Sequence, residues 1–538
     1  MKHTTSIEAL ESRIAPAAVF ALSGSVLKIT GDANNDTVKV SYSGTVSNTN
    51  HILTITGASS GSGSTNGNGI FTISETSAIK SIVINLGNGS NDVTFSNDDG
   101  DNFIASISYT GGVAADTLHF EDFNSDAGMM AKLGLGDDVV NFRESTVGVA
   151  INTVGFAKDV SIDLGGGNNQ ITTTASGAGT HAPSLEFHGA LTITGGNGSD
   201  AINLGVDLSS VIGFMNTNVL VGKTLTFNGG KGANDFNVFG TDITLGKTTL
   251  KSADLLAGFT PSIIGSASAT ITAGSLTVAA PANATNSFDL EAPTIKVSGG
   301  ISYAGGAAAD TVNIGTVSGS LSTIIAGKIG VTNGAGTNIT KIGSLATPGT
   351  LFVTGALALT GGIGSDTLAI HSTSGSISGG VSTTLGAGAS NVSVAGSGLI
   401  IAGLTVKTSG VGSAADTLTL SGLISTKAIS ATLGAGAATV KIDDIIALDK
   451  FTLNTGAGGS TINIETDAAF TGASTFFKAA NIISGIGADA LTIGSATSVT
   501  FLSSLTAKLG LLEVNGTNTS NITGTFLPGF SSVVTGNN

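Results

Sequence analysis

The chain has 538 residues with 79 glycines, no cysteine and 11% charged residues, which leave a net charge of −15. The absence of cysteine excludes disulfides, thiolate catalysis and cysteine-bound zinc. The acidic balance, with only two arginines, argues against nucleic-acid binding. The 41% hydrophobic content argues against disorder, and no run reaches the ~18–20 apolar residues of a transmembrane helix. The composition therefore predicts a folded, β-rich protein.

Residues 1–25 differ from the rest of the chain. A polar stretch with two acids is followed by the nine-residue apolar run Ile14–Leu22 and by Ser23-Gly-Ser25. The apolar run and the small residues are typical of a signal peptide, whereas the acids and an early proline are not. The residues alone leave two interpretations: an export or targeting segment, or a cap on the first turn with a short helix over Ser6–Arg13.

One part of this segment carries a family resemblance. Leu10-Glu-Ser-Arg-Ile-Ala-Pro-Ala-Ala18 resembles the LEPR-type segment that opens large exported β-strand repeat proteins of planctomycete and verrucomicrobial bacteria. Ser12 stands where that family usually has proline, and the match covers under a tenth of the chain. The resemblance implies export to the cell surface or beyond, and it implies no activity.

A glycine-rich turn then recurs along the chain, mostly ending in Asp or Asn. The copies are Leu86–Asp92, Gly111–Asp116, Leu133–Asp138, Leu164–Asn169, Gly195–Asp200, Gly229–Asp235, Gly305–Asp310, Gly361–Asp366, Leu385–Asn391, Gly410–Asp416, Leu433–Ala438 and Gly485–Asp489. Alternation beside the turns, as in Leu191-Thr-Ile-Thr194, predicts strands with apolar side chains inward and Thr outward. We expect the glycines to supply positive φ angles, and Asp or Asn to cap each turn by hydrogen bonding to its own backbone.

The spacing of the turns indicates the architecture. Gly361, Gly386, Gly410 and Gly434 are 25, 24 and 24 residues apart, and other steps nearer 30 indicate loop insertions. This predicts an all-β parallel β-helix, or β-solenoid, of roughly 24-residue rungs with one glycine corner each, continuous over residues 26–538. A unit of about 48 residues and a β-sandwich array are the alternatives.

An irregular segment lies at about residues 240–297, where the glycine turn disappears. Strand-like pieces such as Ala269-Thr-Ile-Thr272 persist, three prolines cluster, and Leu250–Phe259 is compatible with a helix. We expect the rod to continue with altered corners and the prolines to lie at edges and in loops. A break into two halves is the alternative.

Two turns have a calcium-binding pattern. Gly195–Asn203 and Gly361–Ala369 match G-G-x-G-x-D-x-U-x and are similar to the nonapeptides of calcium β-rolls. Ca²⁺ needs six to eight oxygen ligands, however, and these nonapeptides stand singly, so turn capping by Asp is the alternative. The candidate calcium ligands are Asp92, Asp116, Asp137, Asp138, Asp200 and Asp366, and no other cofactor is expected.

Catalytic patterns are scarce. There is no phosphate-binding G-x-x-x-x-G-K-[ST] motif, and the six histidines lack metal-ligand spacing. Asp137-Asp138 could serve as paired carboxylates of a polysaccharide-acting enzyme, but aromatic platforms are few and Arg143 is the only arginine after residue 13. Such an enzyme would need carboxylates from different rungs in one groove with a basic residue nearby.

The sequence thus predicts a non-enzymatic exported surface protein, either an adhesin-like or a structural, S-layer-like rod. Its expected partners are a cell-surface polysaccharide, a protein or further copies of itself, and not nucleic acid. A secreted polysaccharide-acting β-helix enzyme and a calcium-dependent repeat module are the alternatives.

Overall fold

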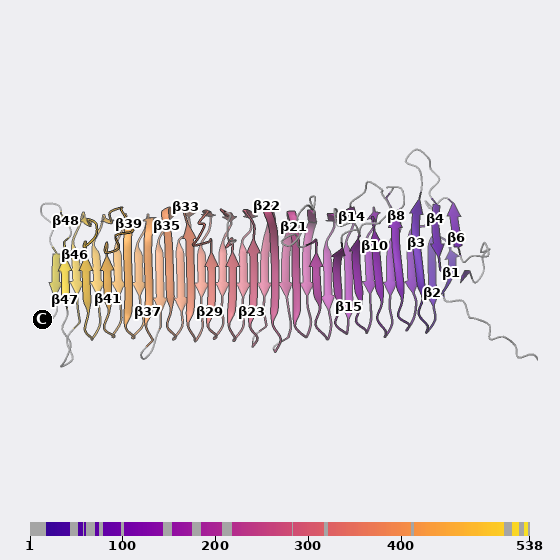
Figure 1. Cartoon of the computed structure of the whole chain (residues 1–538), viewed down its shortest axis with the longest axis horizontal. Coiled ribbons are helices and arrows are strands. Elements are labelled where there is room, and N and C mark those ends of the chain that lie inside the picture. The colour runs from indigo at the N-terminus through magenta and orange to yellow at the C-terminus, as the bar shows by residue number, and fades with distance from the viewer. Residues whose placement is uncertain are drawn as a thin grey trace, which may run out of the picture.

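The protein is a straight β-solenoid rod, seen in a computed structural model in which every regular element of the described residues is a strand (Figure 1). Its turns are roughly 26 residues long. The structure describes residues 18–43, 52–57, 59–60, 70–74, 79–97, 102–143, 153–174, 184–206, 218–254, 256–281, 283–316, 321–409, 414–510, 519–523, 525–526 and 532–535. The parallel β-solenoid predicted from the glycine spacing is confirmed. A β-sandwich array is excluded, because successive turns pair strand to strand in parallel.

Each turn contributes to three parallel sheets that run along the rod. The strand that follows the glycine corner belongs to what we call the post-corner sheet, the next belongs to the middle sheet, and the last belongs to the pre-corner sheet, which leads into the next corner. The post-corner strands are β3 (Thr37–Ser43), β8 (Asp92–Asn97), β10 (Thr117–Glu121), β13 (Val139–Arg143), β16 (Gln170–Thr174), β19 (Ala201–Leu204), β23 (Asn286–Glu291), β26 (Asp310–Ile314), β29 (Asn338–Ile342), β32 (Asp366–Ser372), β41 (Thr461–Ile464), β44 (Ala490–Ile493) and β47 (Thr519–Ile522).

The other two sheets are built in the same way. The middle strands are β11 (Asn124–Ser125), β14 (Thr153–Phe156), β17 (Ser184–Phe187), β24 (Thr294–Val297), β27 (Thr323–Ala326), β30 (Thr350–Val353), β33 (Ser374–Ile377), β42 (Thr475–Phe476), β45 (Thr500–Phe501) and β48 (Thr525–Phe526). The pre-corner strands are β2 (Val26–Gly31), β7 (Ser81–Asn85), β9 (Ser106–Thr110), β12 (Met129–Lys132), β15 (Val160–Gly165), β18 (Leu191–Gly195), β25 (Ile301–Ala304), β28 (Ile329–Thr332), β31 (Leu357–Thr360), β34 (Val381–Leu385), β36 (Leu404–Thr408), β38 (Ile429–Thr432), β40 (Phe451–Asn454), β43 (Ala480–Ile483), β46 (Leu505–Lys508) and β49 (Ser532–Thr535).

Six long strands bend from one sheet into the next. They are β20 (Asn218–Asn228), β21 (Asn234–Lys251), β22 (Phe259–Ala279), β35 (Asn391–Ile401), β37 (Asp416–Ser425) and β39 (Ala438–Ala447). β21 and β22 pair in parallel from Asn234↔Phe259 to Lys251↔Ala279 and so contribute to all three sheets. These long strands carry the rod through the segment where the glycine turn disappears.

One expectation for this segment is wrong and another is met only in part. Leu250 lies in β21 and Phe259 in β22, and the described residues between them form no helix, because the chain only has to cross one corner there. Pro281 and Pro293 lie between strands as expected, but Pro261 lies inside β22 opposite Phe236. Its missing N–H is tolerated at this position, since pairing of β22 with the following β23 begins one residue later, at Ser262.

The N-terminal end departs from the parallel pattern. β1 (Ala18–Ser23) pairs antiparallel with β2, and β4 (Ile52–Thr56) pairs antiparallel with both β3 and β6 (Ile70–Ser74). β5 (Ser59–Ser60) pairs in parallel with β1. Of the predicted export or capping segment, residues 1–25, the first 17 lie outside the described residues, among them the LEPR-like residues up to Ala17, and Ala18–Ser23 form β1.

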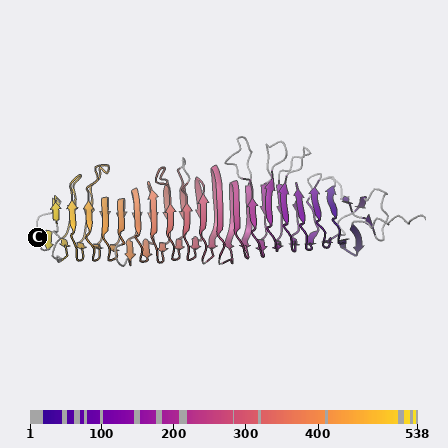
Figure 2. The ribbon, with the colours of Figure 1, turned by 60° about the horizontal axis from the view of Figure 1, so that its bottom comes forward.

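The core is one continuous column of apolar side chains between the sheets, because alternate residues of each strand point inward. Aromatic rings stack from turn to turn in this core: Phe95 on Phe120, with centroids 5.2 Å apart, and Phe476 on Phe501, 5.1 Å apart. Figure 2 shows the strands standing side by side along the rod, so that each turn contacts its neighbours.

Candidate functional site

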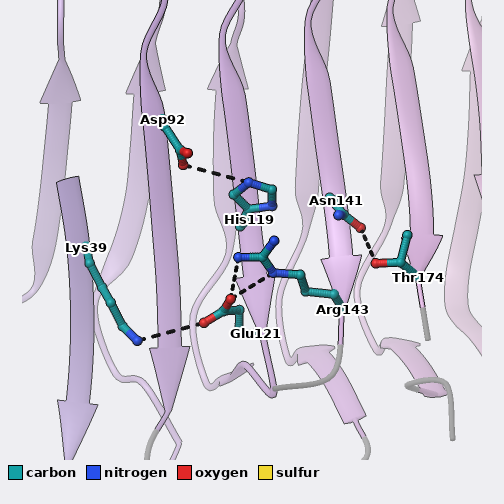
Figure 3. A network of polar contacts seen from close by, with 7 residues as sticks. All are labelled: Lys39, Asp92, His119, Glu121, Asn141, Arg143 and Thr174. Carbon is teal, nitrogen blue, oxygen red and sulfur yellow. Dashed lines mark hydrogen bonds and ion pairs between the residues drawn. The ribbon is translucent and has the colours of Figure 1, made fainter. Parts of the chain in front are cut away.

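A charged cluster occupies the outer face of the post-corner sheet near the N-terminal end (Figure 3). It consists of Lys39 on β3, Asp92 on β8, His119 and Glu121 on β10, and Arg143 on β13. Parallel pairing places Glu121 directly beside Arg143 and His119 directly beside Thr94, so these side chains project from the same face one strand apart.

Glu121 is the centre of this charged cluster. The Arg143 guanidinium binds one carboxylate oxygen of Glu121 through both Nε, at 2.7 Å, and Nη2, and Lys39 Nζ lies 3.8 Å from the other oxygen. The Glu121 side chain is only 18% exposed, so the pair with Arg143 is partly shielded from water. Such a charge-assisted contact fixes both side chains.

His119 lies beside this pair, with Nε2 3.7 Å from Asp92 Oδ1. Burial, and then the positive charge of Arg143, lower the pKa of His119, while Asp92 and Glu121 oppose that shift. His119 is therefore neutral at pH 7. Two carboxylates from adjacent turns thus meet a histidine and an arginine, although Glu121 is already engaged by two cations.

A second polar feature, which we call the corner column, lies inside the glycine corner. It contains the residue at the start of each post-corner strand. Its polar members are Asp36, Asn91, Asp116, Asp138, Asn169, Asp200, Asn234, Asn286, Asp310, Asn338, Asp366, Ser390, Asp416, Ser460 and Asp489, each at most 2% exposed. The backbone N–H of one turn donates to Oδ1 of the next turn, as from Asp116 to Asp138 at 2.6 Å and from Asp138 to Asn169 at 2.9 Å. The column therefore links neighbouring turns.

This finding corrects the expected cap. Asn residues of the corner column do bond to their own turn, since Nδ2 of Asn169 donates to Gly167 O at 3.2 Å. The Asp residues instead accept hydrogen bonds from the preceding turn. A carboxylate cannot donate as an amide does, so it accepts from the strand stacked beside it, as Asp116 Oδ1 accepts from Asn91 N at 3.0 Å.

The glycines also have two distinct roles. Gly198 and Gly364 have φ of 136° and 149°, which meets the expectation of a positive φ. Gly195 and Gly361, which open the same turns, do not have positive φ angles. A Cβ at Gly195 would lie 2.1 Å from Oδ2 of Asp200, and one at Gly361 would lie 2.0 Å from Oδ2 of Asp366. The opening glycine therefore makes room for the buried carboxyl group.

The six candidate calcium ligands are separated by this arrangement. Asp116, Asp138, Asp200 and Asp366 are buried in the corner column, while Asp92 belongs to the charged cluster and Asp137 is exposed and accepts a hydrogen bond from Asn168 N at 2.7 Å. Among the described residues, no three carboxylate or imidazole side chains gather as metal ligands would. Calcium binding stays a prediction, which a chelator titration tests.

Columns of hydroxyl side chains follow the outer face of the pre-corner sheet. The longest unbroken one, which we call the hydroxyl column, consists of Ser161, Thr192, Thr226, Thr249, Thr277 and Ser302, each paired with the next. Neighbouring strands in a sheet lie about 4.8 Å apart, so the hydroxyls repeat at that interval over six turns. A second run, Ser382, Thr405, Ser430 and Thr452, repeats the pattern nearer the C-terminus.

The middle sheet has a different, more apolar surface. Ile325, Phe352 and Ile400 point outward and are 38%, 42% and 43% exposed. Beside Ile325 lies a groove of about 250 Å³, whose lining includes Lys296 and Thr354.

The charged cluster was not predicted from the sequence as a unit, although the separation of its residues by about one turn is a signal from which it could have been found. Asp92 lies 25 residues before Thr117, and Glu121 lies 22 residues before Arg143, which are both one turn.

No protein-family model matches this chain, and neither the curated proteins nor the solved structures yield a match. Among the described residues, no helix is long and apolar enough to cross a membrane.

Proposed function

We propose that this protein is a non-enzymatic exported rod that works at the cell surface as an adhesin-like or structural, S-layer-like protein. The observation that carries the proposal is the hydroxyl column, in which six side chains repeat at the interval of the strands. A ligand that itself repeats, such as a surface polysaccharide, can form one weak contact per turn and gain affinity by multivalency. The LEPR-like segment supports export.

Binding to polysaccharides tests this function. Full-length protein is applied to immobilised polysaccharides of different composition, and the variant Thr192→Val/Thr226→Val/Thr249→Val is compared with it. Loss of three adjacent hydroxyls should weaken binding by at least tenfold, because contacts on one repeating ligand act together. The matched control Thr311→Val/Thr367→Val, on the post-corner sheet, should bind normally. Equal binding by all three proteins would remove the hydroxyl column from the proposal.

The location is tested separately by fractionating the native cells and sequencing the N-terminus of the mature protein. An intact Met1 on cytoplasmic protein would contradict export. Self-association is a further outcome of the proposal, and the exposed Ile325, Phe352 and Ile400 are the side chains to change when it is measured by sedimentation.

A polysaccharide-acting enzyme is the second candidate, favoured by one observation. Asp92 and Glu121 come from adjacent turns and have His119 and Arg143 between and beside them, as an acid–base pair with a positively charged neighbour requires. Release of reducing ends from a polysaccharide, abolished in Glu121→Gln but not in Asp163→Asn, would establish this function.

A further inference from the structure

Six aspartates of the corner column have a buried carboxyl oxygen that no donor approaches with hydrogen-bond geometry. They are Asp36, Asp116, Asp138, Asp200, Asp310 and Asp366, each at most 1% exposed. Backbone N–H groups, such as that of Gly112 beside Asp116 and that of Gly386 beside Asp366, partly oppose the rise that burial causes in the pKa of those two carboxyls. Among the described residues, no ion pair contains any of the six. A buried ionised carboxylate without donors or a counter-ion is strongly unfavourable, whereas a neutral carboxylic acid is tolerated.

The surroundings of these oxygens favour a carboxylic acid. Oδ2 of Asp116 and the carbonyl oxygen of Leu133 both lie 2.1 Å from the point that a Cβ of Gly111 would occupy. A carbonyl oxygen only accepts hydrogen bonds, so it repels an ionised Oδ2 and attracts one that carries a proton. Oδ2 of Asp36 has an equivalent neighbour in the carbonyl oxygen of Leu86.

Two other aspartates of the same column show what a satisfied carboxylate looks like. Asp416 Oδ2 accepts from Thr408 Oγ1 at 2.5 Å and from the N–H of Gly434 at 2.9 Å. Asp489 Oδ2 accepts from Ser484 Oγ at 2.6 Å. In these turns a hydroxyl residue stands before the corner in place of the opening glycine, and it donates to the oxygen that the glycine turns leave without a partner.

Asp116 and Asp138 lie in adjacent turns of the corner column, with no Asn turn between them. Ionising both carboxyl groups would therefore be the most unfavourable at this position. Burial raises the pKa of Asp138 to about 6, the N–H of Asp116 opposes that shift, and the negative charges of Asp116 and Asp137 add to it. Burial also raises the pKa of Asp200 to about 6. The other titratable group that faces this step is Tyr109, beside Asp116, whose own pKa burial raises.

We propose that these six corner aspartates hold protons in the folded rod, and that the corner column is a pH-sensitive device which tightens the turns in mild acid and weakens them when the protons leave. This device does not depend on the proposed surface function. It concentrates near the N-terminus, where Asp116, Asp138 and Asp200 lie within four consecutive turns.

The direction of the pH effect follows from proton linkage. The pKa of Asp138 is raised in the folded state from 3.8 to about 6, so its contribution to stability is fully present below pH 3.8 and is lost as the pH rises through about 6. His119 and His371 act in the opposite direction, because burial lowers their pKa values and stability falls as they are forced to accept protons. Variants of single aspartates therefore isolate the effect better than the wild type alone.

The experiment compares the full chain with Asp138→Asn and Asp200→Asn by thermal unfolding at pH 5 and pH 8. Asn is accepted in this column, as Asn91 and Asn169 show, so both variants should fold. We expect each to raise the melting temperature at pH 8 by about 1–3 °C and to raise it less at pH 5, where part of the aspartate contribution is still present. The control Asp163→Asn, on the outer face, should shift it equally at both pH values.

Infrared spectroscopy gives a readout that does not depend on stability. The wild type at pH 5 should show the carbonyl stretch of buried protonated carboxyl groups, and this band should shrink in Asp138→Asn and at pH 8. Equal effects of Asp138→Asn on melting at pH 5 and pH 8, or a spectrum at pH 5 without this band, would overturn the proposal.

Discussion

The turns near the N-terminus and those near the C-terminus bury the carboxyl group of their corner aspartate in different ways. Around Asp116 and Asp200 the corner opens with glycine, and the second carboxyl oxygen has no partner. Around Asp489 it opens with Ser484, whose hydroxyl donates to that oxygen. The repeating backbone thus accommodates the carboxyl groups of Asp116 and Asp200 by making space for them, and that of Asp489 by hydrogen bonding it.

The outer face of the post-corner sheet differs between the same regions. Near the N-terminus it carries Glu121 beside Arg143, whereas the equivalent column near the C-terminus runs through Ser421 and Asp443. The ion pair of Glu121 with Arg143 therefore has no counterpart at the Ser421–Asp443 position.

Replacing the opening glycine should have the largest effect. Gly195→Ala would place a Cβ 2.1 Å from Asp200 Oδ2 and 2.7 Å from Gly229 O, and the backbone of the next turn cannot move away cheaply. We expect destabilisation by about 3 kcal/mol or more, as for overpacked cores. Denaturant unfolding followed by circular dichroism measures it.

Gly330→Ala is the matched control for this change, because nothing lies within 4 Å of the Cβ it adds on β28. Its effect should stay within about 0.5 kcal/mol. If Gly195→Ala were as mild as Gly330→Ala, the opening glycine would not be making room for the aspartate.

Removing Arg143 should have the next largest effect. Arg143→Ala leaves the Glu121 carboxylate, 18% exposed, with only the distant Lys39 as a counter-ion. We expect a loss of about 1–3 kcal/mol, since hydrogen bonds to charged groups contribute about that much. The pKa of His119, measured by NMR, should rise at the same time, because the positive charge of Arg143 lowers it. An unchanged His119 titration would show that the two side chains do not interact.

The repeating elements of the fold could be predicted from the sequence because they depend on local chemistry. Glycine spacing gave the turn length, and alternation such as Leu191-Thr-Ile-Thr194 identified the buried face of β18. The path of β21 and β22 could not be predicted, because strands that bend across corners without glycine carry no turn residues to mark them. The role of the opening glycine could not be predicted either, because it depends on contacts with the neighbouring turn, such as that of Gly195 with Gly229.

The site residues could be predicted only in part, and for a related reason. The sequence singled out Asp138 and Asp200, but it could not show that each accepts a hydrogen bond from the turn before it. That partner lies 22 or 31 residues away, and the step varies along the chain. To predict such contacts between turns from the sequence, the number of residues in every loop insertion would have to be known.

Changing the hydroxyl of a C-terminal corner should have a moderate effect. Ser484→Ala removes the 2.6 Å hydrogen bond to Asp489 Oδ2 and leaves the N–H of Gly510, at 3.3 Å, facing that oxygen. We expect a loss of about 1–2 kcal/mol in the free energy of unfolding, since a buried carboxyl oxygen loses its best donor. Denaturant unfolding measures it, and an unchanged midpoint would show that the Ser484 hydroxyl does not stabilise this corner.

Replacing Lys39 or Lys441 should have the smallest effects on stability. The comparison tests whether the charged cluster stabilises the rod through its ion pairs. Lys39 is 45% exposed and its Nζ lies 3.8 Å from Glu121, so Lys39→Ala should cost about 0.2–1 kcal/mol, less at high salt. Lys441, on the equivalent column of β39, has Thr419 and Asn463 as its cross-strand neighbours and is in no ion pair among the described residues, so Lys441→Ala should change stability less than Lys39→Ala does. The two lysines occupy the same position on the turn, but only Lys39 lies near Glu121. A salt-dependent difference between the two losses of unfolding free energy therefore measures the attraction between Lys39 and Glu121. Identical unfolding curves at low salt would mean that the ion pair with Lys39 contributes nothing, and that Arg143 alone holds Glu121.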